Sequence, residues 1–208
     1  MAKQPSNHNK INNFQRIREL GHKQQGLLAL MLLERMKPNY QLFAELTEYP
    51  QPHNLDNMLN SLWERLLVKG AKVSLGAMEE KIEALTPDEH DFDMYGVYPA
   101  IYFCTALLTY INGEMDEESY DPVAISKISQ GCIVHLLETQ ADEELDNAQL
   151  REHELMQLEV GFLSDSLHWL EAFTFKGKDF KAIKGTAMAR VFADGVTNIG
   201  IEIDMPHQ

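Results

Sequence analysis

The residues best suited to do chemistry lie close together in one polar loop. It contains His90, Asp91 and Asp93, whose nitrogen and oxygen atoms could act as ligands for a divalent cation. Tyr95 and Tyr98 follow, and their rings could line the mouth of a pocket. The same pattern is typical of an Asp-rich turn that caps the next helix, and Asp-x-Asp also recurs by chance. We favour the turn and expect no metal or cofactor, but keep the two aspartates and two tyrosines as ligand-binding candidates.

A second pair of potential ligands lies on a predicted helix. His135 and Glu138 are three residues apart and therefore neighbours on the helix surface. A carboxylate-bridged metal site in a helical bundle needs Glu-x-x-His on two helices and further glutamates on two others. Here the order is reversed and no second copy exists. We therefore expect a hydrogen bond on the helix surface.

A third polar group directly follows the most apolar run of the chain, residues 27–33. It consists of Glu34, Arg35, Asn39 and Tyr40. A buried Glu or Arg needs a partner, so a paired network here could be structural or part of a pocket. We favour the structural role and keep all four as ligand-binding candidates.

Familiar catalytic signatures are missing from the sequence. It has no Gly-rich phosphate loop, no Gly-x-Ser-x-Gly, no Cys-x-x-Cys and no His-Glu-x-x-His. Catalytic residues therefore stay unknown, and an enzymatic role stays open.

Helical periodicity dominates the elements that must position these residues. Apolar residues recur at steps of three and four in several segments; the clearest run is Leu55, Met58, Leu59, Leu62, Trp63, Leu66 and Leu67. Asn54 is placed to cap this helix. The fold class is therefore all-α: a compact single-domain bundle of about seven or eight helices with a short extended C-terminal segment. We expect one domain over residues 1–208, with a candidate disordered segment at 1–10 and an extended tail at 196–208.

Three local features qualify this pattern. Pro38 should begin a separate short helix after residues 27–36. Residues 150–175 could form one long helix that bends at Gly161. Isoleucines alternate at residues 199–203, so this tail could pair across an oligomer interface, pair with residues 72–74 or pack on the helices. We favour packing on the helices.

Cysteine usage and hydropathy indicate a cytoplasmic protein. Cys104 and Cys132 both fall in apolar helical patterns, where free thiols behave as small hydrophobes. Residues 97–111 are nearly all apolar, but they would span only about 22 Å as a helix, less than a bilayer core. We therefore expect interior helices and no membrane association.

Charge is distributed very unevenly. Residues 78–161 hold 20 of the 32 acidic residues and only three basic ones, Lys81, Lys127 and Arg151. The whole chain has a formal net charge of −14, which repels phosphate backbones and anionic lipids. Residues 1–37 are locally basic, but Glu19 interrupts this cluster and the rest of the molecule repels phosphate. We expect no nucleic acid and no membrane as partners.

Several blocks of sequence resemble the YjaG-like family of uncharacterised bacterial proteins (domain of unknown function 416). The blocks are residues 34–40 with Phe43, Trp63-Glu64 with 68–69 and 71–73, residues 91–101 as the most specific block, residues 137–140, and residues 198–201. The resemblance covers the chain from about residue 14 to 201, with a divergent region at 142–194. The resemblance implies an all-helical, cytoplasmic bacterial protein. It implies no activity and no catalytic residues.

Two functions follow from these observations. The first is a non-enzymatic interaction module, expected to be a homo-oligomer, that presents its acidic surface to a basic protein partner. The second is a small-ligand-binding protein or enzyme, with a pocket formed where residues 91–99 and 34–40 meet. The missing signatures and the acidic segment favour the first.

Overall fold

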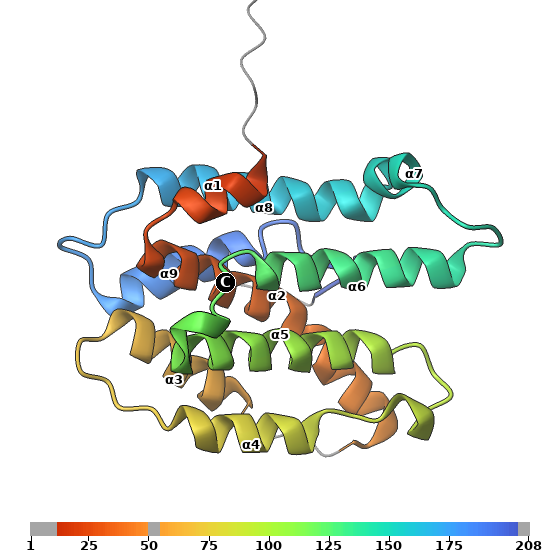
Figure 1. Ribbon diagram of the computed structural model, residues 1–208, viewed down its shortest axis with the longest axis horizontal. Coiled ribbons are helices and arrows are strands. Elements are labelled where there is room, and N and C mark those ends of the chain that lie inside the picture. The colour runs from red at the N-terminus through yellow and green to blue at the C-terminus, as the bar shows by residue number, and fades with distance from the viewer. Residues whose placement is uncertain (1–11, 50–54, 204–208) are drawn as a thin grey trace, which may run out of the picture.

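The computed structural model describes residues 12–49 and 55–203, and these form an all-helical fold (Figure 1). The helices are α1 (Asn13–Glu19), α2 (His22–Thr47), α3 (Leu55–Leu67), α4 (Leu75–Leu85), α5 (Val97–Met115), α6 (Ala124–Gln140), α7 (Asn147–Glu152), α8 (Glu154–Ala172) and α9 (Phe180–Val191), with the 3-10 turns η1 (Glu89–Asp91) and η2 (Glu117–Ser119). Within these ranges the chain forms no β-strand, only an isolated bridge. The all-α prediction is confirmed.

Helix α2 is the central element of the bundle. It packs against α3, α5, α6, α8 and α9, with α8 along one side of the molecule and α4 along the other (Figure 1). Its residues from Leu30 to Leu33 are apolar and all buried, and a helix segment that is apolar on all sides belongs in the interior.

Pro38 lies inside α2, so the prediction of a separate helix was wrong. Proline has no amide hydrogen, so the carbonyl of Glu34 loses its usual helical partner. The helix continues because Tyr40, Phe43 and Ala44 on the next turns are buried in the core, and this burial outweighs the missing hydrogen bond. Tertiary packing therefore overrides the local signal.

The long segment after residue 146 breaks at His153 and not at Gly161. His153 has extended backbone angles, and its Nδ1 accepts a hydrogen bond from the amide of Leu155, so it caps α8. Gly161 is an ordinary helical residue of α8 that faces open space. The predicted bend was thus placed eight residues too far along the chain.

The start of α6 and the C-terminal segment complete the fold. Asp121 accepts a hydrogen bond from the amide of Val123 just before α6, which begins at Ala124. The predicted cap Asn54 lies outside the described residues. After α9 the chain turns back on itself at Gly200, whose φ of 80° favours glycine. Glu202 then forms a β-bridge with Val196. The tail therefore pairs with its own chain segment and not with residues 72–74. The described part of the tail packs on the helices through buried Ile199, as expected.

The core carries both cysteines as free, buried thiols. Burial raises the pKa of Cys104 and of Cys132 to about 12, so both stay protonated at neutral pH and behave as small hydrophobes. None of the helices in the described ranges combines the length and hydropathy needed to cross a bilayer.

Candidate functional site

Four of the predicted site residues lie on the buried turns of α2. Glu34, Arg35, Asn39 and Tyr40 are each no more than 3% exposed. Tyr40 Oη donates a hydrogen bond to the carbonyl of Leu85 at 3.1 Å, and burial raises the pKa of its phenol well above the usual value. The other three side chains form the polar interior of the bundle.

Arg35 is the centre of a buried ion-pair network. Its Nε donates to Glu159 Oε2 at 3.0 Å, and its Nη2 donates to Asp194 Oδ2 at 2.6 Å. Nη1 donates to Asp194 Oδ1 and to the carbonyls of Val191 and Val196, at 2.9, 2.9 and 3.0 Å respectively. One guanidinium group therefore joins α2 to α8 and to the segment that follows α9.

The pKa values of the two carboxyl groups in this network shift in opposite directions. Burial raises the pKa of Glu159, although Arg35 and the hydroxyl of Ser129, 2.5 Å from Oε1, favour its charged form. Partial burial also opposes ionisation of Asp194, but the hydrogen bonds and charge of Arg35 outweigh it and lower the pKa. Burial disfavours the guanidinium cation as well, yet its carboxylate partners raise the Arg35 pKa. Arg35 is held as a cation between one deeply buried and one half-exposed carboxyl group.

A chain of amides ties the C-terminal segment to the same core. Asn39 Nδ2 donates to Asn198 Oδ1 at 2.8 Å, and Asn198 Nδ2 donates to the carbonyl of Ser129 at 3.3 Å. Asn39 Oδ1 is buried with no hydrogen-bond partner among the described residues. Because Ser129 also bonds to Glu159, the amide chain and the ion-pair network meet on α6.

Glu34 joins α2 to α3. The indole Nε1 of Trp63 donates to Glu34 Oε1 at 3.0 Å. Lys37 Nζ lies 3.0 Å from Glu34 Oε2 and 2.6 Å from Asp56 Oδ1, so one ammonium bridges a buried and an exposed carboxylate. All four predicted α2 residues are thus used within the fold, which favours a structural role for them.

The loop before α5 is anchored by its aromatic residue. The ring of Phe92 lies 4.9 Å from that of Phe43 on α2 and 5.6 Å from that of Tyr49. Asp91 and Asp93 flank Phe92 and are both exposed. In the part of the chain that the structure describes, no three His, Cys, Asp or Glu side chains come together as a metal site.

Tyr95 and Tyr98 belong to an aromatic cluster around His135. Tyr95 Oη and His135 Nδ1 share a hydrogen bond of 3.1 Å. The ring of Tyr98 lies 4.5 Å from the imidazole, and the ring of Tyr102 lies 6.0 Å from it. All four side chains are half-buried, whereas Glu138 is exposed. His135 therefore bonds to a tyrosine. We had expected its side chain to bond to a neighbour on its own helix.

The two groups of predicted site residues do not join. Over residues 12–49 and 55–203, no hydrogen bond or ion pair connects Glu34, Arg35, Asn39 or Tyr40 to residues 91–98. The first group bonds to α3, α4, α8 and the C-terminal segment, and the two tyrosines of the second pack on His135 of α6. The structure thus separates a structural polar core from a half-exposed aromatic cluster.

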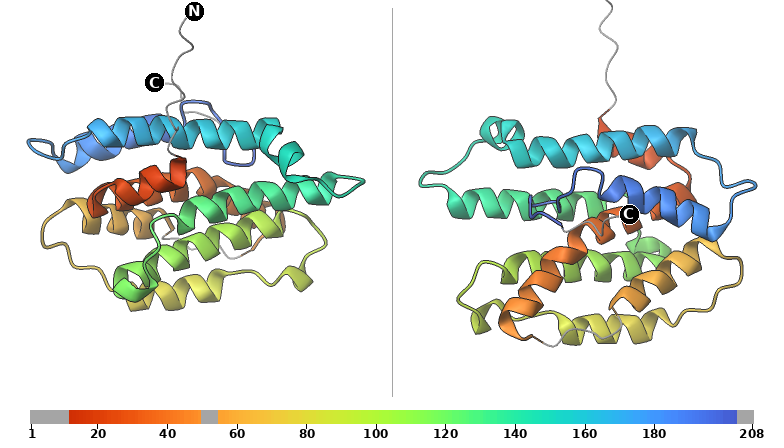
Figure 2. Two further views of the ribbon diagram at one scale, coloured as in Figure 1. Left: turned by 45° about the horizontal axis from the view of Figure 1, so that its top comes forward. Right: turned by 180° about the vertical axis from the view of Figure 1, so that it is seen from behind.

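Two acidic segments lie at the same end of the bundle, the end that carries this cluster. Residues 86–96 and residues 141–153 share that end in Figure 1 and in both views of Figure 2. We call these two segments the acidic end. The first has four carboxylates and no Lys or Arg, and the second has five carboxylates and Arg151. All nine carboxylate residues are exposed: Asp88, Glu89, Asp91, Asp93, Asp142, Glu143, Glu144, Asp146 and Glu152.

The carboxylates of the acidic end form no ion pair with Lys or Arg among the described residues. Among the described residues, the carboxylates of the 78–161 segment that pair with Lys or Arg are Glu114, Asp121 and Glu159, none of which belongs to the acidic end. At this end the carboxylates are used only locally; for example, Asp146 caps α7 by accepting from the amides of Ala148 and Gln149. The net negative charge there is therefore not offset by any ion pair within the described chain.

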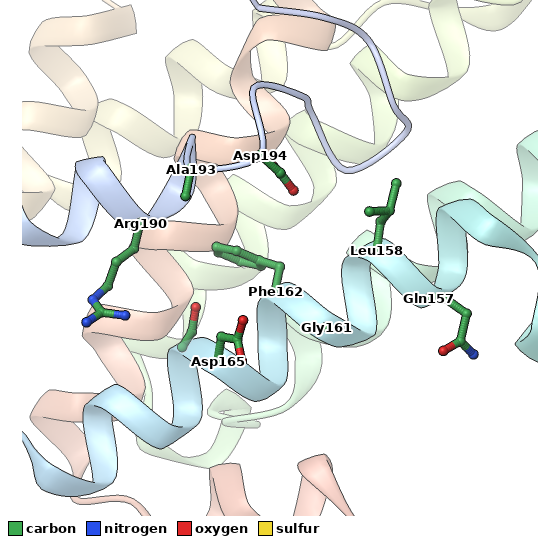
Figure 3. A pocket seen from close by; sticks show the side chains of 9 residues that line it. Gln157, Leu158, Gly161, Phe162, Asp165, Arg190, Ala193 and Asp194 are labelled. Atoms are coloured by element: carbon green, nitrogen blue, oxygen red, sulfur yellow. The ribbon is translucent and has the colours of Figure 1, made fainter.

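Sequence reasoning missed a groove between α8 and the chain at the end of α9. It has a volume of about 320 Å³ and is lined by Gln157, Leu158, Gly161, Phe162, Asp165, Ser166, Arg190, Ala193 and Asp194 (Figure 3). We call it the α8–α9 groove. Asp194 connects it to Arg35. One signal was available: Glu159 lies three residues from both Met156 and Phe162 on the buried face of α8, where a carboxylate needs a cation.

Comparisons with known proteins agree with this architecture. A family model described as "Protein of unknown function (DUF416)" matches residues 12–202. The chain belongs to the DUF416 family. A DUF416 family protein from Shewanella baltica OS155, known from a crystal structure, superimposes with a TM-score of 0.83 at 32% identity, covering 93% of this chain and 100% of that chain.

Two curated relatives extend the DUF416 match. The chain is 34% identical over 171 residues to the "Uncharacterized protein YjaG" of Escherichia coli K12, covering 82% of this chain and 86% of the relative. It is 33% identical over 175 residues to an "Uncharacterized protein" of Haemophilus influenzae, covering 82% and 87%. The predicted family resemblance is confirmed. The DUF416 description brings no activity, so function must be argued from the geometry.

Proposed function

We propose that this DUF416 protein is a non-enzymatic interaction module that binds a basic segment of a partner protein at its acidic end. One observation carries the proposal: the nine exposed carboxylates there have no Lys or Arg partner among the described residues. Clustered like charges repel one another, and a cationic partner would relieve this repulsion and be steered towards it.

The aromatic cluster adds a feature that a simple charged surface lacks. Tyr95 and Tyr98 directly follow the acidic loop and are half-buried. Aromatic faces attract guanidinium and ammonium groups, and Arg is the more frequent partner. The expected partner segment is therefore rich in arginine, with exposed carboxylates to pair its charge and tyrosine rings to pack its side chains.

The pocket hypothesis has less support. Glu34, Arg35, Asn39 and Tyr40 are buried and bonded to other parts of the fold, so they are not free to bind a ligand together with residues 91–99. The interaction hypothesis needs only groups that are already exposed.

The proposal includes a cytoplasmic setting and a protein partner. Both cysteines are buried free thiols, which suits a reducing compartment. A net charge of −14 disfavours phosphate backbones and anionic membranes.

Affinity capture from a bacterial lysate tests the proposal when charge-matched variants are compared. The end variant carries Glu89→Gln, Asp91→Asn and Asp93→Asn. The control variant carries Glu64→Gln, Glu80→Gln and Glu118→Gln, three exposed carboxylates outside the acidic end. We expect a basic protein that the wild type and the control variant retain at low salt, that the end variant loses, and that high salt elutes.

Two results would count against the proposal. If the end variant recovers the same proteins as the wild type, the acidic end does not take part in binding. Recovery of partners that high salt does not release would show that attraction between opposite charges does not hold the complex.

A further inference from the structure

The α8–α9 groove is lined by both charged and apolar side chains. In Figure 3, Arg190 lies at one end, Asp165 and Phe162 lie in the middle, and Leu158 lies with Gln157 towards the other end. A volume of about 320 Å³ lies within the range of small-molecule sites. The groove is separate from the acidic end, because its lining comes from α8 and from residues 190–194.

Two charged residues of the groove do not neutralise each other. Arg190 and Asp165 are exposed and line the same groove, yet neither forms an ion pair with any residue that the structure describes. The guanidinium of Arg190 also lies 4.9 Å from the ring of Trp169, a residue outside the groove, which restricts the position of the cation. Unpaired charges of opposite sign in one groove match a ligand that carries both charges.

A serine hydroxyl also lines the groove. Ser166 is 2% exposed as a residue, and its side chain has no hydrogen-bond partner among the described residues. A hydroxyl that no protein group engages is available to donate a hydrogen bond to a ligand. The wall beside it is fixed, because Asp194 is held by Arg35 and the ring of Phe162 lies 4.6 Å from the Arg35 guanidinium carbon.

We propose that the α8–α9 groove binds a free α-amino acid with an apolar side chain. The carboxylate of the ligand pairs with Arg190 and accepts from the Ser166 hydroxyl, and its ammonium group pairs with Asp165. Its side chain lies over Phe162 towards Leu158. This inference goes beyond the proposed interaction function and does not depend on the acidic end.

Ligand-observed NMR with the twenty amino acids, followed by calorimetry, tests the ligand class. We expect saturable binding of at least one apolar amino acid. Its analogue without the amino group and its analogue without the carboxylate should each bind about tenfold more weakly or worse, since each leaves one charged residue unpaired. The proposal is overturned if none of the twenty binds, or if either analogue binds as well as the amino acid.

Two glycine variants test the location. An added Cβ at Gly161 or at Gly185 meets no atom within 4 Å, and both glycines are exposed and helical; only Gly161 lines the groove. Gly161→Leu should fill the groove and abolish binding with an unchanged or higher thermal midpoint, because leucine is the better helix former. Gly185→Leu is the matched control and should bind as the wild type does. Undiminished binding by Gly161→Leu, or equal loss in both variants, would place the ligand elsewhere.

Discussion

The polar core around Arg35 and the acidic end use the same carboxylate side chains in opposite ways. Glu159 is 2% exposed and bonded to Arg35 and Ser129, so its charge is matched inside the fold. The carboxylates of the acidic end are exposed and lack a basic partner among the described residues. Charge matched in the interior specifies how helices join, whereas unmatched charge on the surface is available to another molecule. Stability and binding should therefore respond to different substitutions.

The largest effect on stability should come from removing the central cation. Arg35→Met leaves Glu159 buried without its counter-charge, so the free energy of unfolding should fall by about 3–5 kcal/mol. Urea unfolding followed by circular dichroism measures the loss.

A double variant separates the cost of burying an unpaired charge from the net contribution of the ion pair to stability. Because hydrophobic replacement of a buried ion pair is often neutral, Arg35→Met with Glu159→Leu should recover much of that loss. If the single variant is as stable as the wild type, the core network contributes little to the fold.

A smaller effect should come from the amide chain that holds the C-terminal segment. Asn198→Ala removes the acceptor of Asn39 Nδ2 and leaves a buried donor, which should cost about 2 kcal/mol. Hydrogen exchange should quicken most at residues 196–203. Faster exchange spread evenly over all helices would contradict a local role for Asn198.

Asp194, the more exposed carboxylate of the Arg35 network, should make the free energy of unfolding depend on pH. The pKa of Asp194 is lowered in the folded state, so its contribution is present above its unfolded pKa and is lost as the pH falls through the folded value. Asp194→Asn should cost about 1 kcal/mol at neutral pH, and the difference from the wild type should shrink below about pH 4. Urea unfolding at a series of pH values measures this, and a constant difference would exclude Asp194 as its source.

The smallest effect on stability should come from the acidic end. The end variant should change the free energy of unfolding by no more than about 0.5 kcal/mol, as expected for exposed substitutions. Thermal melts of the end and control variants provide the check. A loss of several kcal/mol would mean that these carboxylates serve the fold.

The sequence predicted the elements of this protein better than their connections. The period of apolar residues located α3, whose Leu59, Leu62 and Trp63 are buried as expected, because one helix face must enter the core. The prediction for Pro38 was wrong because the preference of proline for the first turn of a helix is outweighed by the burial of the turn that follows.

The site was predictable only in part. The pattern of Glu34 and Arg35 after an apolar run indicated a buried network, but its partners Glu159 and Asp194 lie 124 and 159 residues further along the chain. No spacing rule covers such distances. The α8–α9 groove was missed for the same reason, since it exists only where α8 meets the end of α9.

The most direct test of the central claim is a binding titration with a labelled, arginine-rich peptide. The account predicts that the wild type and the control variant bind alike at about 50 mM salt, that the end variant binds about tenfold more weakly, and that about 300 mM salt weakens binding for all three. Equal affinities for the end and control variants would contradict the account, because the position of the carboxylates would then not matter.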